Sequence, residues 1–269
     1  MALQFLCMKW GNLYGPEYVN RLYTMIAAHS GGEFRLVCLT DDAEGIRPEV
    51  ECLPCPEIAL PMPYCRAGWR KLTTFAGSES LYGLTGEWLF LDLDVVICGG
   101  LDEFFAFRPD EPFVVMQNWT QPGKGIGNTS VYRFRVGALA HILEGLLTDV
   151  DGVLDRYSNS QTYISRVLGM PIFWPDDWCV LFKVQCVPPW PRRFWRVPRI
   201  PLGARIVAFP GVPNPHEAVE GQWPAKWYKR FYKYVRPTPW IANLWNGNPP
   251  ALGGNGTKSA WAARAKIKS

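Results

Sequence analysis

The chain has 269 residues, of which 48% are apolar, 19% charged and 14% aromatic. This composition excludes a disordered, collagen-like or coiled-coil protein, and a chain of this length can bury a full core in one large domain, with or without an appendage. The net charge of +4 is unevenly distributed, because residues 178–269 hold 15 lysines and arginines but only two acidic residues, while the preceding part is net negative.

The sequence shows neither a membrane span nor a disulfide framework. No apolar run approaches the roughly 18–20 residues needed to cross a bilayer, and the first residues lack the charged region and cleavage site of a signal peptide. Eight cysteines are too few for a disulfide scaffold at this length, and several lie in apolar runs. We therefore expect reduced, buried cysteines in the cytoplasm. Cys52 and Cys55 form a lone C-x-x-C pair, which is weak evidence for zinc.

The first 40 residues predict a β-loop-α-β unit. A short apolar run over 3–8 is typical of a strand, and Pro16 is placed to open a helix after a glycine-containing loop. Apolar residues at helical spacing continue to Ile26, a Ser-Gly-Gly stretch ends the helix, and a second strand follows over 34–39. Such a unit predicts parallel strands joined by a right-handed crossover.

The later elements are predicted from apolar runs and the turn residues between them. Residues 48–65 are rich in proline and cysteine and are expected to be irregular. Strands are expected over 88–97, 112–116, 129–134 and 205–209, and helices over 67–81, 137–147 and 159–168. The pattern weakens after residue 174, and the Gly/Asn/Pro stretch over 246–257 is typical of a flexible linker to a short basic end.

Two aspartates, Asp92 and Asp94, interrupt the apolar run over 88–97. Residues two apart in a strand point to the same side, so both carboxylates are expected to face one site. Carboxylates at the end of a buried strand are costly to desolvate, and two oxygen ligands are the start of a Mg²⁺ or Mn²⁺ site. The alternative is a pair that caps a loop or forms salt bridges with arginines.

The segment over 88–105, WLFLDLDVVICGGLDEFF, resembles the D-x-D segment of nucleotide-sugar glycosyltransferases with the GT-A fold. It is most similar to the family 8-like bacterial enzymes that build lipopolysaccharide and capsule sugars, where Gly-x-Leu-Asp-Glu-Leu/Phe-Phe follows the D-x-D strand. The resemblance implies an α/β fold with a mixed, mostly parallel Rossmann-type sheet flanked by helices. We place this transferase domain over 1–220 and a basic, tryptophan-rich C-terminal extension over 221–269.

Further segments match the family in the same order. They are 9–22 for the nucleotide base, 69–72 for a basic residue that reaches the nucleotide, 127–131 and 160–164 beside the sugar, and 209–215, which closes on the diphosphate. The donor-binding residues that this resemblance implies are Lys9, Asn12, Tyr14, Asp41, Lys71, Asp92, Asn128, Ser130 and Gly211.

The resemblance implies transfer of a sugar from a nucleotide-diphosphate donor, UDP rather than GDP, to a saccharide or lipid-linked saccharide in cell-surface glycan synthesis. Asp92 and Asp94 would hold Mn²⁺ or Mg²⁺, a Lewis acid that stabilises charge on the leaving diphosphate. Asp94 is expected to be the firmest ligand and a catalytic residue, and Lys71 or Arg70 would add positive charge.

The stereochemical course stays open. A retaining reaction, as in the family, would place Gln161 beside the anomeric carbon and would need no strong base. An inverting reaction would need a carboxylate base, for which Asp176 and Asp177 are the candidates. A turn after Pro175 is the alternative role for these two aspartates.

Three positions depart from the family pattern. Pro210 stands where the family has a histidine that usually serves as a third metal ligand, Asn214 where it has a lysine, and Ser160 where it has an aspartate. These departures leave open weaker metal binding, another metal ligand such as His216, or an inactive relative.

Cations and aromatic residues alternate over 226–236, and Trp240 and Trp245 follow. One interpretation is an interfacial helix over 226–236 that attaches the protein peripherally to the anionic inner face of the cell membrane. A packed C-terminal subdomain with tryptophans in its core is the second. Nucleic-acid binding is the third, but no motif supports it, so we expect no nucleic-acid partner.

Two other functions stay open beside sugar transfer. One is a catalytically silent relative that acts as a membrane-associated binding or assembly protein. The other is a metal-dependent nucleotidyltransferase, which also uses paired carboxylates on an α/β sheet. That class usually carries a glycine-rich N-terminal loop with Arg and Lys, whereas the loop over 9–16 has only Lys9.

Overall fold

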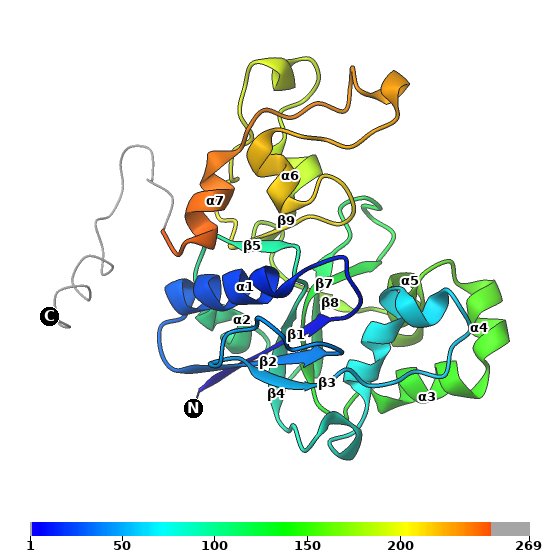
Figure 1. Cartoon of the computed structure of the whole chain (residues 1–269). Coiled ribbons are helices and arrows are strands. Elements are labelled where there is room, and N and C mark those ends of the chain that lie inside the picture. Colours follow the sequence, from blue (N-terminus) through cyan, green and yellow to red (C-terminus); the bar gives the residue numbers. More distant parts are fainter. Residues whose placement is uncertain (1, 249–269) are drawn as a thin grey trace, which may run out of the picture.

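The computed structural model describes residues 2–248, whose central feature is a seven-stranded sheet in the order β3-β2-β1-β4-β7-β6-β8 (Figure 1). Its strands are β1 (Leu3–Lys9), β2 (Phe34–Thr40), β3 (Glu51–Pro54), β4 (Glu87–Leu91), β6 (Phe113–Gln117), β7 (Gly127–Arg135) and β8 (Ile172–Phe173). The first four run parallel, and β7 runs antiparallel to both of its neighbours. The predicted parallel β-loop-α-β unit is therefore confirmed. Strand β3 lies in the stretch that was expected to be irregular.

A second, three-stranded sheet has the order β5-β10-β9, formed by β5 (Val95–Ile97), β10 (Ile206–Ala208) and β9 (Cys179–Leu181). The single strand expected over 88–97 is thus two strands in two sheets. The chain leaves the main sheet at Asp92 and enters the second sheet at Val95. The two aspartates lie in the short link between β4 and β5.

The helices are α1 (Pro16–His29), α2 (Asp102–Ala106), α3 (Ala140–Thr148), α4 (Val150–Arg156), α5 (Ser160–Leu168), α6 (Pro215–Glu220) and α7 (Pro239–Trp245). Helix α1 packs against both β2 and β5, between the two sheets (Figure 1). Helices α3 and α5 pack with the 3₁₀ segment Gly68–Phe75 against the other face of the main sheet. Helices α2, α4, α6 and α7 were not predicted, while α3 and α5 confirm the expected helices over 137–147 and 159–168.

Both faces of the main sheet are buried. Phe5 and Cys7 of β1 belong to the core on the α1 side, whereas Leu6 and Met8 belong to the core on the opposite side. This explains why the parallel strands read as continuous apolar runs, since neither face is left to water. All eight cysteines are free thiols, and Cys7 is fully buried.

Two predicted helices are wrong. The stretch over 67–81 forms the 3₁₀ segments Gly68–Phe75 and Glu79–Leu81, with extended backbone at Ala76 between them. The Thr73 and Thr74 hydroxyls donate to the carbonyls three residues earlier, a local hydrogen bond that competes with regular α-helix.

The interfacial helix expected over 226–236 is also absent from the described chain. One 3₁₀ turn, Trp227–Lys229, is all that forms there. A segment this short is a marginal helix without a packed apolar face, and Trp227 is 82% exposed. The end of the predicted linker over 246–257, and the basic end after it, lie outside the described residues. Within residues 2–248 no helix is both long enough and apolar enough to span a bilayer.

Helix α7 supplies packing that the sequence did not indicate. Ile241 and Leu244 are fully buried, and Trp245 is 7% exposed. The helix packs against α1 and α6, and the Arg21 guanidinium lies 4.2 Å from the Trp245 ring centre. Part of the C-terminal region is therefore core, as the packed interpretation of its tryptophans expects.

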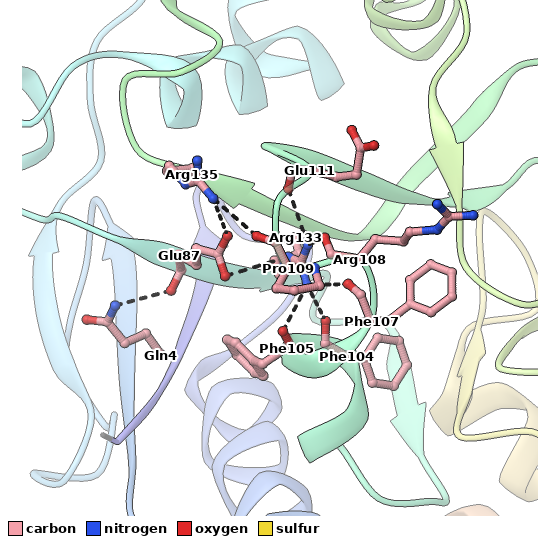
Figure 2. Close-up of polar contacts among 10 residues, drawn as sticks. All are labelled: Gln4, Glu87, Phe104, Phe105, Phe107, Arg108, Pro109, Glu111, Arg133 and Arg135. Carbon is pink, nitrogen blue, oxygen red and sulfur yellow. Dashed lines mark hydrogen bonds and ion pairs between the residues drawn. The ribbon is translucent and has the colours of Figure 1, made fainter.

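A buried arginine on β7 holds the chain that follows the aspartate link (Figure 2). The Arg133 side chain is fully buried, and its guanidinium donates five hydrogen bonds of 2.6–3.2 Å. The acceptors are the backbone carbonyls of Phe104, Phe105, Phe107, Arg108 and Glu111. Burial lowers the pKa of Arg133, and the nearby Glu87 carboxylate opposes this effect. The network fixes α2 and its exit against the main sheet.

We expect Arg133→Met to lower the free energy of unfolding by about 2–4 kcal/mol, because five buried carbonyls lose their donor. Urea denaturation followed by circular dichroism measures this. Arg135→Met is the matched control, since Arg135 is 45% exposed and its ion pair with Glu87 contributes less than about 1 kcal/mol. Equal losses in the two variants would contradict the assignment.

Candidate functional site

A cavity of about 870 Å³ lies where β1, β2 and β4 end, and residues that directly follow these strands line it. Ligands of open α/β sheets bind at the carboxyl ends of the parallel strands. Its lining residues are Met8, Lys9, Trp10, Gly11, Asn12, Leu13, Tyr14, Asp41, Ala67, Gly68, Arg70, Lys71, Asp92, Leu93, Asp94, Gly211, Val212 and Asn214.

The two aspartates are held by backbone hydrogen bonds to both sheets. The Asp92 amide donates to the Ser130 carbonyl of β7 at 2.9 Å, and the Phe209 amide donates to the Asp94 carbonyl at 3.1 Å. The link is thereby anchored on one side by the main sheet and on the other by the segment after β10. Both carboxylates line the cavity.

The Asp92 carboxylate forms an ion pair with Lys71, whose Nζ lies 2.5 Å from Oδ1 and 2.7 Å from Oδ2. Lys71 comes from the 3₁₀ segment Gly68–Phe75, and both side chains are less than 20% exposed. The sequence left open an ion pair with an arginine. The structure shows an ion pair with a lysine that was itself expected to bind the donor.

The Asp94 carboxyl has no cation as direct partner among the described residues. It is 8% exposed, and burial together with the charge of Asp92 raises its pKa to about 7, an effect that Lys71 and the Tyr14 hydroxyl oppose. A carboxyl in this setting carries a large desolvation cost when it ionises. Any cation that binds in the cavity would offset that cost.

Tyr14 connects three parts of the site. Its hydroxyl lies 3.2 Å from Asp94 Oδ2 and 3.0 Å from Asn214 Oδ1, both hydrogen-bond acceptors. Burial and the Asp94 charge raise the Tyr14 pKa, so the phenol stays protonated as a donor. Asn214 in turn caps helix α6 through a capping box with Glu217.

The loop after β1 forms one wall of the cavity. Gly11 has φ +61°, a left-handed conformation that favours glycine, and its amide donates to Asp41 Oδ2 at 2.9 Å. Lys9 is 4% exposed, and its ammonium donates to the Asp42 carbonyl at 2.9 Å. These contacts join the end of β1 to the end of β2.

The structure brings most of the predicted donor-binding residues together. Those that line the cavity are Lys9, Asn12, Tyr14, Asp41, Lys71, Asp92 and Gly211, and the predicted metal ligand Asp94 lines it with them. Asn128 and Ser130 are 2% and 3% exposed in β7 and do not line it. Gln161, at the start of α5, accepts a 3.4 Å hydrogen bond from Asn118 and also lies outside the lining. Asp176 and Asp177 do not line the cavity either.

Several lining residues were not identified from the sequence. Trp10, Leu13 and Leu93 are apolar residues within the segments over 9–22 and 88–105, and Val212 directly precedes the cis peptide bond to Pro213. Their common signal is position, because each lies within two residues of a predicted polar site residue. That signal is visible only once the site itself is known.

The donor set of the cavity fits a hard divalent cation with few protein ligands. Carboxylate oxygens are what Mg²⁺ and Mn²⁺ prefer, and both ions keep positions for water and phosphate oxygens. The described residues contain no group of three His, Cys, Asp or Glu side chains placed to hold a metal ion. Pro210 has no side-chain donor, and the exposed His216 bonds instead to the Tyr18 hydroxyl.

No protein-family model matches the sequence, and no curated protein matches it. Solved structures do. The galactosyltransferase LgtC, in complex with donor and acceptor sugar analogues, matches over 98% of this chain and 100% of its own, at 12% identity and a TM-score of 0.60. The glycosyltransferase GlyE of Streptococcus pneumoniae TIGR4 matches over 79% of this chain, at 13% identity and a TM-score of 0.55.

The bifunctional glycosyltransferase WbbM matches over 92% of this chain, at 12% identity and a TM-score of 0.54. This chain spans 56% of the GlyE chain and 52% of the WbbM chain. At such identities the likeness defines the fold. It confirms a mixed α/β fold with a mostly parallel central sheet flanked by helices, that of GT-A glycosyltransferases.

We expect the Asp94→Asn variant to gain stability relative to the original protein as pH rises in metal-free buffer. The raised pKa means that the folded protein keeps the Asp94 proton up to about pH 7, whereas the unfolded chain releases it near its ordinary value. Stability from this group is complete below that ordinary pKa and is lost as pH rises toward 7. The advantage of Asp94→Asn should therefore grow by about 2 kcal/mol between pH 5 and pH 8.

Denaturation in EDTA at both pH values measures this difference. Asp92→Asn is the control of opposite sign, since it leaves the Lys71 cation unpaired and should lower stability at both pH values. If the stability difference between Asp94→Asn and the original protein does not change with pH, Asp94 is not a buried carboxyl without a cation partner.

Proposed function

We propose that this protein is a glycosyltransferase that moves a sugar from a nucleotide-diphosphate donor, preferentially a UDP-sugar, to a saccharide or lipid-linked saccharide. The observation that carries the proposal is the cavity that joins Asp92 and Asp94 to the N-terminal loop and to Gly211. A metal-bound nucleotide diphosphate needs carboxylates for the metal, a positive charge near the phosphates and an aromatic surface for the base. The cavity offers all three in Asp92 and Asp94, Lys71 and Trp10. The GT-A fold of the chain supports the same conclusion.

In this proposal the nucleotide lies along the loop over 9–14. Trp10 offers an aromatic surface and Asp41, at the end of β2, a carboxylate for hydroxyl groups of the nucleotide. The diphosphate lies toward Asp92 and Asp94, with Lys71 beside them as a fixed positive charge. Positioned charge of this kind stabilises a leaving diphosphate as the glycosidic bond breaks.

Asp92 and Asp94 would hold Mn²⁺ or Mg²⁺, which when bound supplies Lewis-acid stabilisation of the leaving group. Tyr14 orients the Asp94 carboxylate through its hydroxyl. Asn214, at the position of the lysine in the pattern that the sequence resembles, brings no charge, and Lys71 is the cation that pairs with Asp92 in the described part of the chain. This arrangement favours a site that relies on a bound cation for charge neutralisation.

For the sugar end of the donor, Gln161 is the proposed residue beside the anomeric carbon in a retaining reaction. Asn118 holds its side chain by a hydrogen bond, and Asn128 lies on the neighbouring strand.

A catalytically silent relative is the alternative function that two observations support. Asp92 is already paired with Lys71, and Pro210 offers no metal ligand. No observation supports the nucleotidyltransferase alternative. The only cation in the loop over 9–14 is Lys9, which donates to a backbone carbonyl.

UDP binding separates these functions. Calorimetry should show UDP binding that depends on Mn²⁺ and is tighter than GDP binding, and Asp94→Asn should weaken it by at least about 100-fold, because a cation ligand is worth several kcal/mol. Asp110→Asn is the matched control, since Asp110 is exposed and does not line the cavity.

If UDP binds equally well to Asp94→Asn and without metal, the metal-dependent mechanism is wrong. If UDP binds but no UDP-sugar is hydrolysed or transferred in a donor screen, the silent relative is the better description. If neither nucleotide binds under any condition, the transferase proposal fails.

We further propose that the exposed aromatic residues of the C-terminal region attach the protein peripherally to an anionic membrane surface, where a lipid-linked acceptor would lie. Trp227 is 82% exposed and Phe231 64% exposed, and Lys226 and Lys229 lie beside them. Exposed aromatic rings favour the membrane interface, and nearby cations favour anionic headgroups. No helix is required for this attachment, because the loop itself presents the rings.

Sedimentation with vesicles tests this attachment. The protein should bind vesicles that contain phosphatidylglycerol and not vesicles of phosphatidylcholine alone, and Trp227→Ala with Phe231→Ala should reduce binding about tenfold. Leu147→Ala with Met170→Ala is the control, because these residues are 45% and 89% exposed on other elements. Equal binding by both double variants would contradict the proposal.

A further inference from the structure

A second, smaller cavity of about 350 Å³ lies in the C-terminal region, outside the site described above. It is lined by Gly221, Gln222, Trp223, Pro224, Ala225, Arg230, Lys233 and Tyr234. Cavities of about 300–1,000 Å³ hold small organic ligands, so this one has room for a single sugar unit with a small substituent.

Its charge is positive and uncompensated. Arg230 and Lys233 line the cavity, and within residues 2–248 neither side chain has an ion pair or hydrogen bond. Glu217 and Glu220 are the only acidic residues of the chain after Asp177. Glu217 is engaged in the capping box of α6, and Glu220 accepts a hydrogen bond from Gln222. Two free cations without a carboxylate partner select an anionic ligand, and phosphate is the anion that Arg and Lys both bind well.

The aromatic walls of this cavity are fixed by neighbours outside it. The Arg193 guanidinium lies 5.8 Å from the Trp223 ring centre and donates to the Tyr232 carbonyl at 2.7 Å. Phe194 stacks on Tyr234 with ring centres 5.1 Å apart. Rings held in this way offer a preorganised apolar surface for the C–H face of a sugar.

Lys183 places this cavity beside the candidate donor site. Its ammonium donates to the Pro210 carbonyl at 2.7 Å, next to Gly211 of the donor cavity. Burial and the Lys233 charge lower the Lys183 pKa, whereas the Asp94 charge raises it. Lys183 is thus within electrostatic range of both cavities.

We propose that the cavity formed by Trp223, Arg230, Lys233 and Tyr234 binds the sugar-phosphate part of the acceptor, with its phosphate on the two cations and its sugar ring on the aromatic walls. This assignment rests on the proposed sugar transfer and names the class of acceptor as a phosphorylated saccharide. Lipid phosphate headgroups share the same anionic chemistry, so the test must separate the two sources.

Calorimetric titration with glucose 1-phosphate, with glucose and with UDP plus Mn²⁺ tests the assignment on the full chain. Glucose 1-phosphate should bind and glucose should not. Arg230→Gln with Lys233→Gln should weaken glucose 1-phosphate binding at least tenfold and leave UDP binding unchanged. Lys226→Gln with Lys229→Gln removes the same charge from the same segment outside the cavity, and should weaken it less than threefold.

Trp223→Ala removes one aromatic wall of the cavity and keeps both cations, so it should weaken glucose 1-phosphate binding severalfold. Because UDP and glucose 1-phosphate are titrated separately, failure of UDP to bind counts against the donor site and not against this cavity. Equal loss in the two charge variants would overturn the assignment. So would phosphatidylglycerol vesicle binding that requires Arg230 and Lys233 in a protein that does not bind glucose 1-phosphate, since the cavity would then hold a lipid headgroup.

Discussion

The structure depends on the short link between β4 and β5, where the chain passes from one sheet to the other. Strand β4 is central in the main sheet, and β5 is the edge of the second sheet, so residues 92–94 link the two sheets directly. Hydrogen bonds from Asp92 to β7 and from Phe209 to Asp94 hold this link on both sides. The link therefore cannot move without disturbing both sheets, and its two carboxylates are held rigidly at the edge of the cavity.

Buried charge is distributed unevenly around this link. Asp92 is compensated by Lys71, and the buried guanidinium of Arg133 by five backbone carbonyls, whereas Asp94 has no cation as direct partner among the described residues. Compensated groups such as Arg133 contribute to the stability of the fold. An uncompensated buried carboxyl costs stability, and residues with such perturbed ionisation concentrate at functional sites. Asp92 and Arg133 are therefore charges that the fold itself compensates, whereas Asp94 is the charge that indicates a ligand site.

Two of the positions at which the sequence departs from the pattern it resembles, Asn214 and Pro210, have structural roles in this chain. Asn214 caps α6 and accepts a hydrogen bond from Tyr14, so the residue that replaces a lysine still ties the late segment to the site. The carbonyl of Pro210 accepts a hydrogen bond from Lys183, which lies in the five-residue helical turn Phe182–Cys186. Lys183 therefore lies beside the segment over 209–215. The C-terminal region joins the same area, since Lys233 acts electrostatically on Lys183.

The sequence by itself determined the elements whose signals are local. The apolar runs of β1 and β2, the helix that opens at Pro16 and the aspartate pair at the end of β4 could all be predicted, because strand burial, proline at a helix start and motif spacing need no distant partner. Most of the expected donor residues also lie together, because they follow parallel strands that end at one edge. The second sheet and the burial of α7 were decided by tertiary contacts. So was the pairing of Asp92 with Lys71 and the isolation of Asp94, because charge compensation depends on which side chains meet in space.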